Sequence, residues 1–168
     1  MDYGKLAEKL MGMSDDDWKR HANPWSVWTR VPILPLAVLA IWSRAWIGLW
    51  ALIPISLCVF WAWLNPRAFS IPKTTNTWSG KGTFGERVWL NRKNIPIPEH
   101  HAFMAHLLSG VSLIGIGFLV WGRLYFHVWL TLLGVVLTLG GKIWFVDRMV
   151  WLYEDMKDSS EKYKNWLY

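Results

Sequence analysis

The sequence has a single cysteine and two long blocks in which charged side chains are nearly absent. Cys58 allows no internal disulfide and is predicted to pack as a small apolar side chain. The two blocks cover residues 24–64 and 102–141, and arginine is the only charged residue type in them. A chain of 168 residues has too small a core to bury helices of this kind. These absences therefore exclude an ordinary soluble domain.

Sequence motifs of the common enzyme classes are also missing. There is no nucleophile elbow, phosphate-binding loop, dinucleotide fingerprint or cysteine–histidine zinc pattern. The net charge of +6 does not point to nucleic acid, because the basic residues lie beside the apolar blocks. The sequence thus predicts no catalytic residue and no nucleic-acid partner.

The apolar content is that of a bilayer protein: 53% of the residues are hydrophobic, and 15 are tryptophan. A membrane-spanning helix needs about 20 mostly apolar residues, so each block has room for two. We therefore predict an all-α integral membrane protein with four transmembrane helices arranged as two hairpins. The predicted spans are residues 24–42, with a bend at Pro32 and Pro35, then residues 45–64, 102–121 and 124–141.

We expect one membrane domain made of five segments. They are a cytoplasmic amphipathic N-terminal segment (1–23), hairpin 1 (24–64), a cytoplasmic loop (65–101), hairpin 2 (102–141) and a cytoplasmic amphipathic C-terminal segment (142–168).

Amphipathic interfacial helices are predicted in three of these segments. The N-terminal segment has an apolar face, and Ser14 with Asp17 and Asn23 with Pro24 are predicted to start two short helices. Prolines predict an extended central loop with one interfacial helix over residues 83–93, where Phe84 would face lipid. A further interfacial helix is predicted over residues 143–158. The N-terminal apolar face consists of Tyr3, Leu6, Leu10 and Met13.

Small residues recur along the third and fourth predicted spans. Such residues let helices approach closely in lipid, so the two stripes are predicted to face each other. The stripes are Ala102, Ala105, Ser109 and Ser112 on one span and Thr131, Gly134, Thr138 and Gly141 on the other.

Lysine and arginine counts predict the orientation. Five lie up to Arg30, six in residues 65–101 and five after residue 141, whereas each predicted hairpin tip has one, Arg44 or Arg123. Because cytoplasmic loops are rich in these residues, both termini and the central loop are predicted to face the cytoplasm of a cell-membrane protein. The two tips also match in sequence, with one arginine between aromatic residues in each.

One group of residues could hold a metal ion. Glu99, His100, His101 and His106 are clustered in the sequence before the third span, and histidine with a carboxylate suits zinc or non-haem iron. Solvated interfacial histidines are the competing interpretation. Haem ligation by His106 and His127 is disfavoured, because the two are predicted near opposite ends of adjacent spans. No other cofactor is predicted.

Tryptophan and tyrosine at the ends of the spans are typical of residues at the lipid headgroups. With the arginines beside them, they form the predicted contact surface for the lipid bilayer and for other membrane-protein subunits. The predicted surface consists of Arg30, Arg44, Trp46, Arg123, Tyr125, Trp144, Trp151 and Tyr153.

Several blocks resemble a family of small, uncharacterised multi-pass membrane proteins that share a domain of unknown function. The resemblance is carried by residues 23–30, 65–69, 85–92 and 147–151, and it implies no activity. Two functions remain open. The first is a non-enzymatic accessory or structural subunit of a larger membrane complex, and the alternative is a small membrane-bound metalloenzyme.

Overall fold

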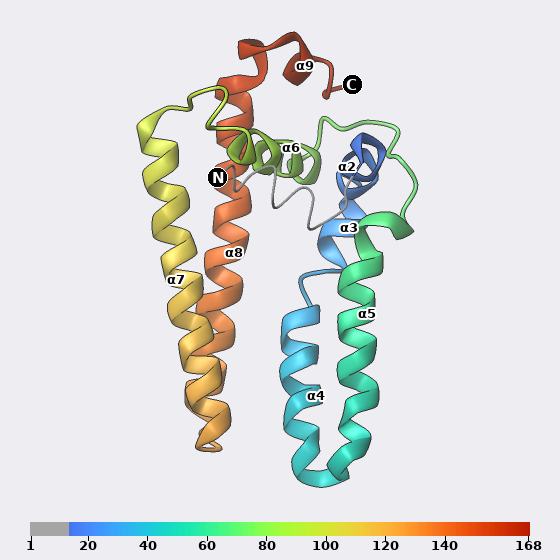
Figure 1. Cartoon of the computed structure of the whole chain (residues 1–168), viewed down its shortest axis with the longest axis vertical. Coiled ribbons are helices and arrows are strands. Elements are labelled where there is room, and N and C mark those ends of the chain that lie inside the picture. Colours follow the sequence, from blue (N-terminus) through green and yellow to red (C-terminus); the bar gives the residue numbers. More distant parts are fainter. Residues whose placement is uncertain (1–13) are drawn as a thin grey trace.

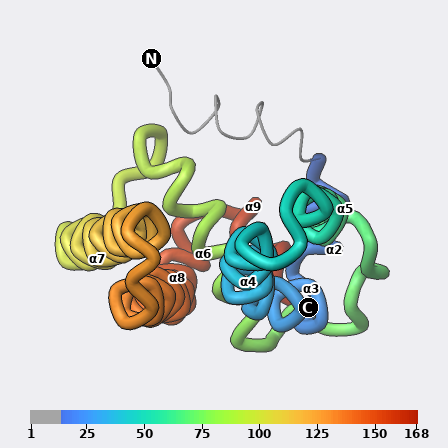
Figure 2. The backbone as a smooth tube through the Cα atoms, turned by 90° about the horizontal axis from the view of Figure 1, so that it is seen from below, coloured from blue at the N-terminus to red at the C-terminus, as the bar shows by residue number. Residues whose placement is uncertain are grey.

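The computed structural model describes residues 14–168, and all regular structure in that part of the chain is helical, as predicted. Two antiparallel pairs of long helices stand side by side, and the short helices gather at one end (Figure 1). The view along the long helices shows the two pairs as separate columns (Figure 2). The apolar face predicted from Tyr3 to Met13 lies outside the described residues. The long helices are α4 (Ile33–Ile47), α5 (Leu52–Ala68), α7 (Glu99–Leu124) and α8 (Val128–Met156).

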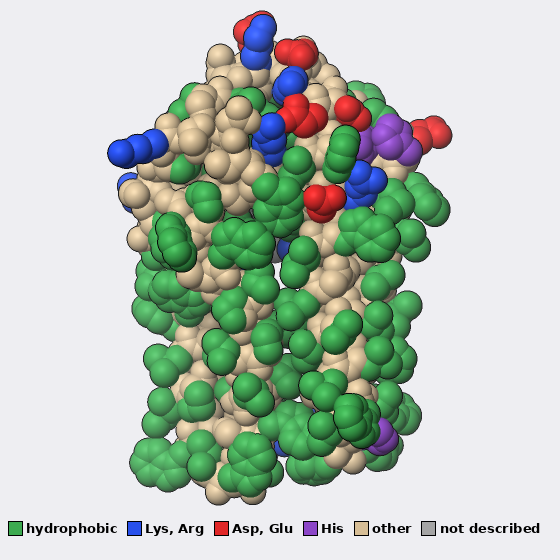
Figure 3. Space-filling view, turned by 180° about the vertical axis from the view of Figure 1, so that it is seen from behind, with side chains coloured by type: hydrophobic (Ala, Val, Ile, Leu, Met, Phe, Trp, Pro, Cys, Tyr) green, Lys and Arg blue, Asp and Glu red, His purple; other side chains and the backbone are tan. Residues whose placement is uncertain are grey.

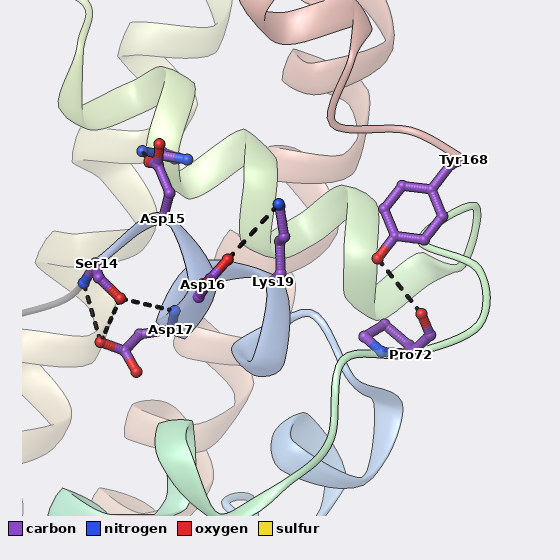
Figure 4. A network of polar contacts seen from close by, with 8 residues as sticks. Ser14, Asp15, Asp16, Asp17, Lys19, Pro72 and Tyr168 are labelled. Atoms are coloured by element: carbon purple, nitrogen blue, oxygen red, sulfur yellow. Dashed lines mark hydrogen bonds and ion pairs between the residues drawn. The ribbon is translucent and has the colours of Figure 1, made fainter.

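The short helices form a cap, by which we mean residues 14–28, 70–98 and 146–168. Its first helix begins as predicted, because Ser14 and Asp17 form a reciprocal capping box (Figure 4). The short elements of the molecule are α2 (Asp15–His21), α3 (Pro24–Trp28), the 3-10 helices η1 (Gly48–Ala51) and η2 (Lys157–Ser159), α6 (Trp78–Leu90) and α9 (Glu161–Lys164).

The first hairpin begins with a broken helix, and the break lies next to Pro32, where the sequence predicted a bend. α3 starts at Asn23 and Pro24, as predicted, but it ends at Trp28. A turn over residues 29–32 then precedes α4. Pro32 explains the break, because proline lacks a backbone N–H and disfavours helical geometry in the residue before it.

The predicted tip of the first hairpin is also corrected. α4 continues through Arg44 to Ile47, and the chain turns at η1, where Gly48 has a φ of 56°. This left-handed conformation favours glycine. Arg44 lies in the last turn of α4, and Arg123 lies in the last turn of α7, just before the second tip. Each arginine is therefore found in the last helical turn before its tip.

The second hairpin packs through small residues, as predicted. Gly134 is so close to α7 that a Cβ atom there would lie 2.7 Å from the backbone nitrogen of Leu119. The hydroxyl of Ser112 donates to the carbonyl oxygen of Thr138 at 3.4 Å. The contacting stripe on α7 differs in part from the prediction, since Ser109 is exposed and Gly115 contacts α8 instead.

The predicted fourth span and C-terminal helix are one continuous helix. α8 has 29 residues, which corresponds to roughly 44 Å at 1.5 Å per residue. α7 runs beside most of its length, from Thr131 to Asp155, and its second half also packs against α6 in the cap (Figure 1). The cap is therefore fixed to the second hairpin by an unbroken element.

The central segment folds into the cap, which corrects the prediction of an extended loop. α6 packs against α8, and Phe84 is fully buried instead of facing lipid, as is Val88. Arg87 is buried at the edge of the same core and forms an ion pair with Asp15 of α2. Fully burying an apolar side chain such as Phe84 or Val88 contributes about 1.5–3 kcal/mol to stability. These two side chains belong to a hydrophobic core inside the cap. That core also includes Met149, Leu152, Tyr153, Met156, Tyr163 and Trp166.

The C-terminal residues close the cap. The backbone N–H of Thr75 donates to the carbonyl oxygen of Tyr168 at 2.9 Å, and the N–H of Tyr168 donates to Thr75 Oγ1 at 3.0 Å. The hydroxyl of Tyr168 reaches the carbonyl oxygen of Pro72 (Figure 4). The chain end thereby joins the segment between the two hairpins.

Within residues 14–168, three helical segments are long and apolar enough to cross a membrane: Pro24–Ala68, Glu99–Leu124 and Val128–Ser159. The first contains both α4 and α5, which fold back on each other at η1. Hydrophobic side chains cover the outside of the long helices, whereas charged side chains gather at the cap (Figure 3). This distribution is that of a membrane protein.

Candidate functional site

A chain of buried polar groups connects the cap to the first hairpin. Ser26 of α3 and Asn65 of α5 are completely buried. The Ser26 hydroxyl donates to Asn65 Oδ1 at 2.9 Å, and Asn65 Nδ2 donates to Thr29 Oγ1 at 2.8 Å. Since buried polar groups need partners, these bonds fix the two helices relative to each other.

His21 continues this chain and is in its neutral form. Arg30 has only donors, and its Nη1 lies 3.0 Å from Nε2 of His21, so this ring nitrogen accepts. The other ring nitrogen, Nδ1, therefore holds the proton and donates to the Ser26 hydroxyl at 3.0 Å. Burial, and then the charge of Arg30, lowers the pKa of His21 to about 3.

A cavity of about 110 Å³ lies beside these groups, between α3, α6 and α8. Its polar wall is formed by His21, Arg30, Glu86 and Lys142. Glu86 and Lys142 form an ion pair across the α6–α8 contact. Burial opposes the ionisation of Glu86, but the charge and hydrogen bond of Lys142 hold the pKa of that carboxyl below its usual value. The apolar lining residues are Val27, Trp28, Val31, Leu139, Ile143 and Val146.

Within residues 14–168, Arg30 has no carboxylate partner at ion-pair distance, and its guanidinium contacts the ring of His21. Its Nε atom is buried without a hydrogen-bond partner. An unsatisfied buried donor of this kind costs about 1–3 kcal/mol. The arrangement therefore offers one cationic donor to an anion in the cavity.

Two tryptophans line the same cavity. The rings of Trp28 and Trp78 are stacked with their centroids 5.8 Å apart. The indole nitrogen of Trp78 donates to Asp147 Oδ1 of α8 at 3.0 Å, so this pair connects α3 to α8 through α6.

A second cavity of about 280 Å³ lies farther along the same side of α4. Residues of α4 form one wall, and residues of α7 and α8 form the other. We call the space between these walls the cleft. Its lining is apolar except for Arg123 and Thr131, and it includes Leu34, Val38, Ile41, Trp42, Leu119 and Val120.

The structure divides the predicted metal ligands. His100 and His101 lie together with Asp155 of α8, with ligand atoms within 4.8 Å of one another. His106 is not in this group, because it packs against the ring of Trp89 at 5.2 Å. Glu99 is exposed at the start of α7 and is also outside the group. Sequence reasoning missed Asp155, which lies 54 residues after His101 and accepts a hydrogen bond from its Nε2 at 2.8 Å.

These three groups have the chemistry of a metal site but somewhat open geometry. Zinc ligands lie about 2.0–2.2 Å from the ion, so a bound ion would replace the hydrogen bond between His101 and Asp155. His101 is buried, whereas His100 and the Asp155 side chain are exposed. The set could supply three ligands to zinc or iron.

The predicted contact residues fall into three groups. The side chains of Trp46, Trp144 and Trp151 are more than half exposed on the long helices. Tyr125 is likewise exposed next to the second hairpin's tip. Tyr153 corrects the prediction, because it is completely buried and its hydroxyl donates to the carbonyl oxygen of Tyr163 at 2.8 Å.

The three predicted arginines have different environments. Arg44 is exposed on α4 and Arg123 stacks over the ring of Phe126 at 4.8 Å, both beside the tips. Arg30 instead enters the cavity at the cap.

Comparison with known proteins gives one match. A family model described as "Family of unknown function (DUF6653)" matches residues 4–166 of the chain. No curated protein and no solved structure matches.

Proposed function

The chain belongs to this family of unknown function, DUF6653, and we propose that it is a non-enzymatic accessory or structural subunit of a larger membrane protein complex. The cap holds the two hairpins together at one end, and their aromatic-rich outer surfaces are available to lipid and to a partner subunit. In this role the protein contributes surface and position, with no catalytic residue of its own.

The proposal includes four membrane crossings, one for each long helix. α4 has 15 residues and α5 has 17, and at 1.5 Å per residue they are about 22 and 26 Å long. The turn at residues 29–32 and η1 extend this hairpin towards the roughly 30 Å of hydrocarbon in a bilayer. The positions of lysine and arginine favour a cap on the cytoplasmic side of the cell membrane.

The observation that carries the proposal is the exposure of the first hairpin. Of the 18 consecutive residues with the highest hydropathy in this hairpin, only 6% are buried inside the chain. Phe60 and Trp63 on α5 have 55% and 60% of their surface exposed, and their rings are neighbours. Aromatic residues are enriched in the centres of protein interfaces, which favours a second protein on this face in addition to lipid.

The test is the mass of the protein isolated in a mild detergent from the membrane in which it is naturally expressed. We expect a complex of defined stoichiometry, well above the 19.6 kDa of one chain, measured by light scattering during gel filtration. Phe60→Ala with Trp63→Ala should release the partner. The matched control is Leu113→Ala with Ile114→Ala on α7, where exposure is 68% and 59%. A monomer in detergent, or equal release by both pairs, contradicts the proposal.

A second candidate function, a small metalloenzyme, is supported by the cluster of His100, His101 and Asp155. It predicts one zinc or iron per chain in protein purified without chelators, measured by elemental analysis. His100→Ala should remove the metal, whereas His106→Ala should retain it, because His106 lies outside the cluster. Protein without metal after reconstitution with zinc or iron would rule this candidate out.

A further inference from the structure

We propose that the cavity beside Arg30 binds the phosphate headgroup of one anionic membrane lipid, whose acyl chains lie in the cleft between the two hairpins. This ligand goes beyond the proposed function, because a subunit that only contributes surface needs nothing in the cleft. Four observations support it: the charge of the cavity, its mixed polar and apolar lining, the apolar cleft farther from the cap, and the depth of the site.

The charge of the cavity is that of an anion site. Its wall contains two cations, Arg30 and Lys142, and one carboxylate, Glu86, so one positive charge remains, because His21 is neutral. Lys142 and Glu86 neutralise each other. The remaining charge is that of Arg30, whose Nε atom is buried and lacks an acceptor. A phosphate oxygen would supply both the acceptor and the opposite charge, and guanidinium–phosphate bonds are among the strong hydrogen bonds of proteins.

The lining of the cavity favours an amphiphile over a soluble anion. Besides the polar groups, the lining includes Val31 of the turn before α4 and Leu139, Ile143 and Val146 of α8. The volume of about 110 Å³ is several times the roughly 10–15 Å³ needed to hold one water molecule. A headgroup on the polar side would leave the apolar side for the first carbons of an acyl chain.

The cleft is a separate apolar cavity that lies farther from the cap. It shares no lining residue with the first cavity, but Leu34 and Val38 of α4 follow Val31 along the chain, and Thr131 of α8 lies on the helix that also carries Leu139. The cavity there is about 280 Å³, and apolar cavities of this kind do not hold water well. A helix is about 10–12 Å across, whereas flexible acyl chains fit a narrow space between two helices.

The site also lies at the depth that a headgroup requires. Trp28 and Trp78 line its mouth, and tryptophan concentrates at the level of lipid headgroups. Lys142 marks the end of the apolar half of α8. A lipid held here would fill the cleft between two hairpins that otherwise make few direct contacts along their length.

The test uses the full-length chain in detergent, delipidated and then titrated with phosphatidylglycerol or with phosphatidylcholine of the same acyl chains. Native mass spectrometry counts the bound lipids. We expect one phosphatidylglycerol per chain, bound at least about tenfold more tightly than phosphatidylcholine. Arg30→Gln should abolish this preference. Arg20→Gln removes the same charge from an exposed position on α2 outside the cavity, and it should leave the preference unchanged.

A second variant tests lipid binding in the cavity if Arg30→Gln does not fold. Leu139→Phe narrows the apolar side and keeps every charge, so it should weaken phosphatidylglycerol binding about tenfold. Glycerol phosphate has the headgroup without the chains, and it should not displace the lipid at millimolar concentration. Displacement by glycerol phosphate, equal binding of the two lipids, or a bound protein in place of lipid would each overturn the inference.

Discussion

Hydrogen-bonded side chains at the start of the first hairpin decide how α3 and α5 are joined. Asn65 both accepts and donates in a fully buried position, and the bonds continue through Ser26 to His21. The hydrogen bonds from His21 to Arg30 and Ser26 require His21 to be neutral. A proton added to His21 would convert the acceptor of the Arg30 bond into a donor and place two cations in contact.

This arrangement predicts a pH dependence of stability. The pKa of His21 is about 3 in the folded protein, against 6.5 for an ordinary histidine, so the unfolded chain binds this proton more readily. The stabilisation is therefore complete above pH 6.5 and is lost as the pH falls towards 3, by up to about 1.4 kcal/mol per pH unit. Thermal unfolding of the protein in detergent, measured from pH 7.5 to 4.5, should show a melting temperature that is constant down to about pH 6.5 and then decreases.

His21→Gln provides the control for this prediction, because glutamine does not titrate. The variant should be less stable than the native chain at pH 7 but nearly independent of pH between 6.5 and 4.5. Asp15 and Glu86, whose pKa values are also lowered, lose their contribution mainly below this range. A parallel pH profile for both proteins would show that His21 is not the titrating group.

The sequence predicted side-chain contacts between residues close together in the chain, and it missed contacts between distant residues. The caps at Ser14 and Asn23 were predictable, because their partners are two or three residues away. Asn65 and Asp155 were not, because their partners lie 36 to 54 residues distant. Tyr153 was assigned to the surface because the sequence pattern of an amphipathic helix is the same whether its tyrosine faces lipid or another part of the chain.

At the scale of elements, the α7–α8 pair depends on close backbone approach. A side chain at Gly134 would collide with the α7 backbone at Leu119, whereas one at Gly140 on the same helix would meet nothing within 4 Å. Gly134→Val should destabilise the protein by about 1–3 kcal/mol, the usual cost of overpacking, and lower its melting temperature in detergent. Gly140→Val is the matched control and should have little effect. Equal melting temperatures for both variants would mean that the two helices separate easily.

Element boundaries could be predicted only where local chemistry sets them. The small residues of α8 correctly indicated its contact face. Pro32 indicated the break between α3 and α4, because proline acts on the helix locally. The contacts of Ser26 and Thr29 with Asn65 were not predictable, because they join segments far apart in the sequence. Residues 83–93 were placed on the membrane surface because their apolar side chains could face lipid while their charged side chains face water. The sequence did not show that α8 would extend far enough to cover the apolar side.

At the scale of the whole molecule, contacts within the cap hold the two hairpins together. The segment that joins the hairpins, residues 70–98, packs on the second half of α8 and is closed by Tyr168. Since α2 and α3 belong to the same cap, both ends of the described chain and its middle lie at one end of the long helices (Figure 1). The membrane orientation of any of these segments is therefore tied to that of the others.

This arrangement gives a prediction for topology. In a Cys58→Ser background, single cysteines at Trp50 in η1 and at Tyr125 after α7 should react with an impermeant thiol reagent added outside intact cells, because both positions lie at the tips and are 73% and 66% exposed. Cysteines at Lys73 in the cap segment and at Lys164 in α9 should react only after the cells are opened, because four crossings place the cap in the cytoplasm. Labelling of Lys73→Cys in intact cells would invert the orientation. Labelling of only one of the two tip positions would mean that one hairpin does not cross the membrane. In that case the lysine and arginine counts would have indicated the correct side for the cap but the wrong number of spans.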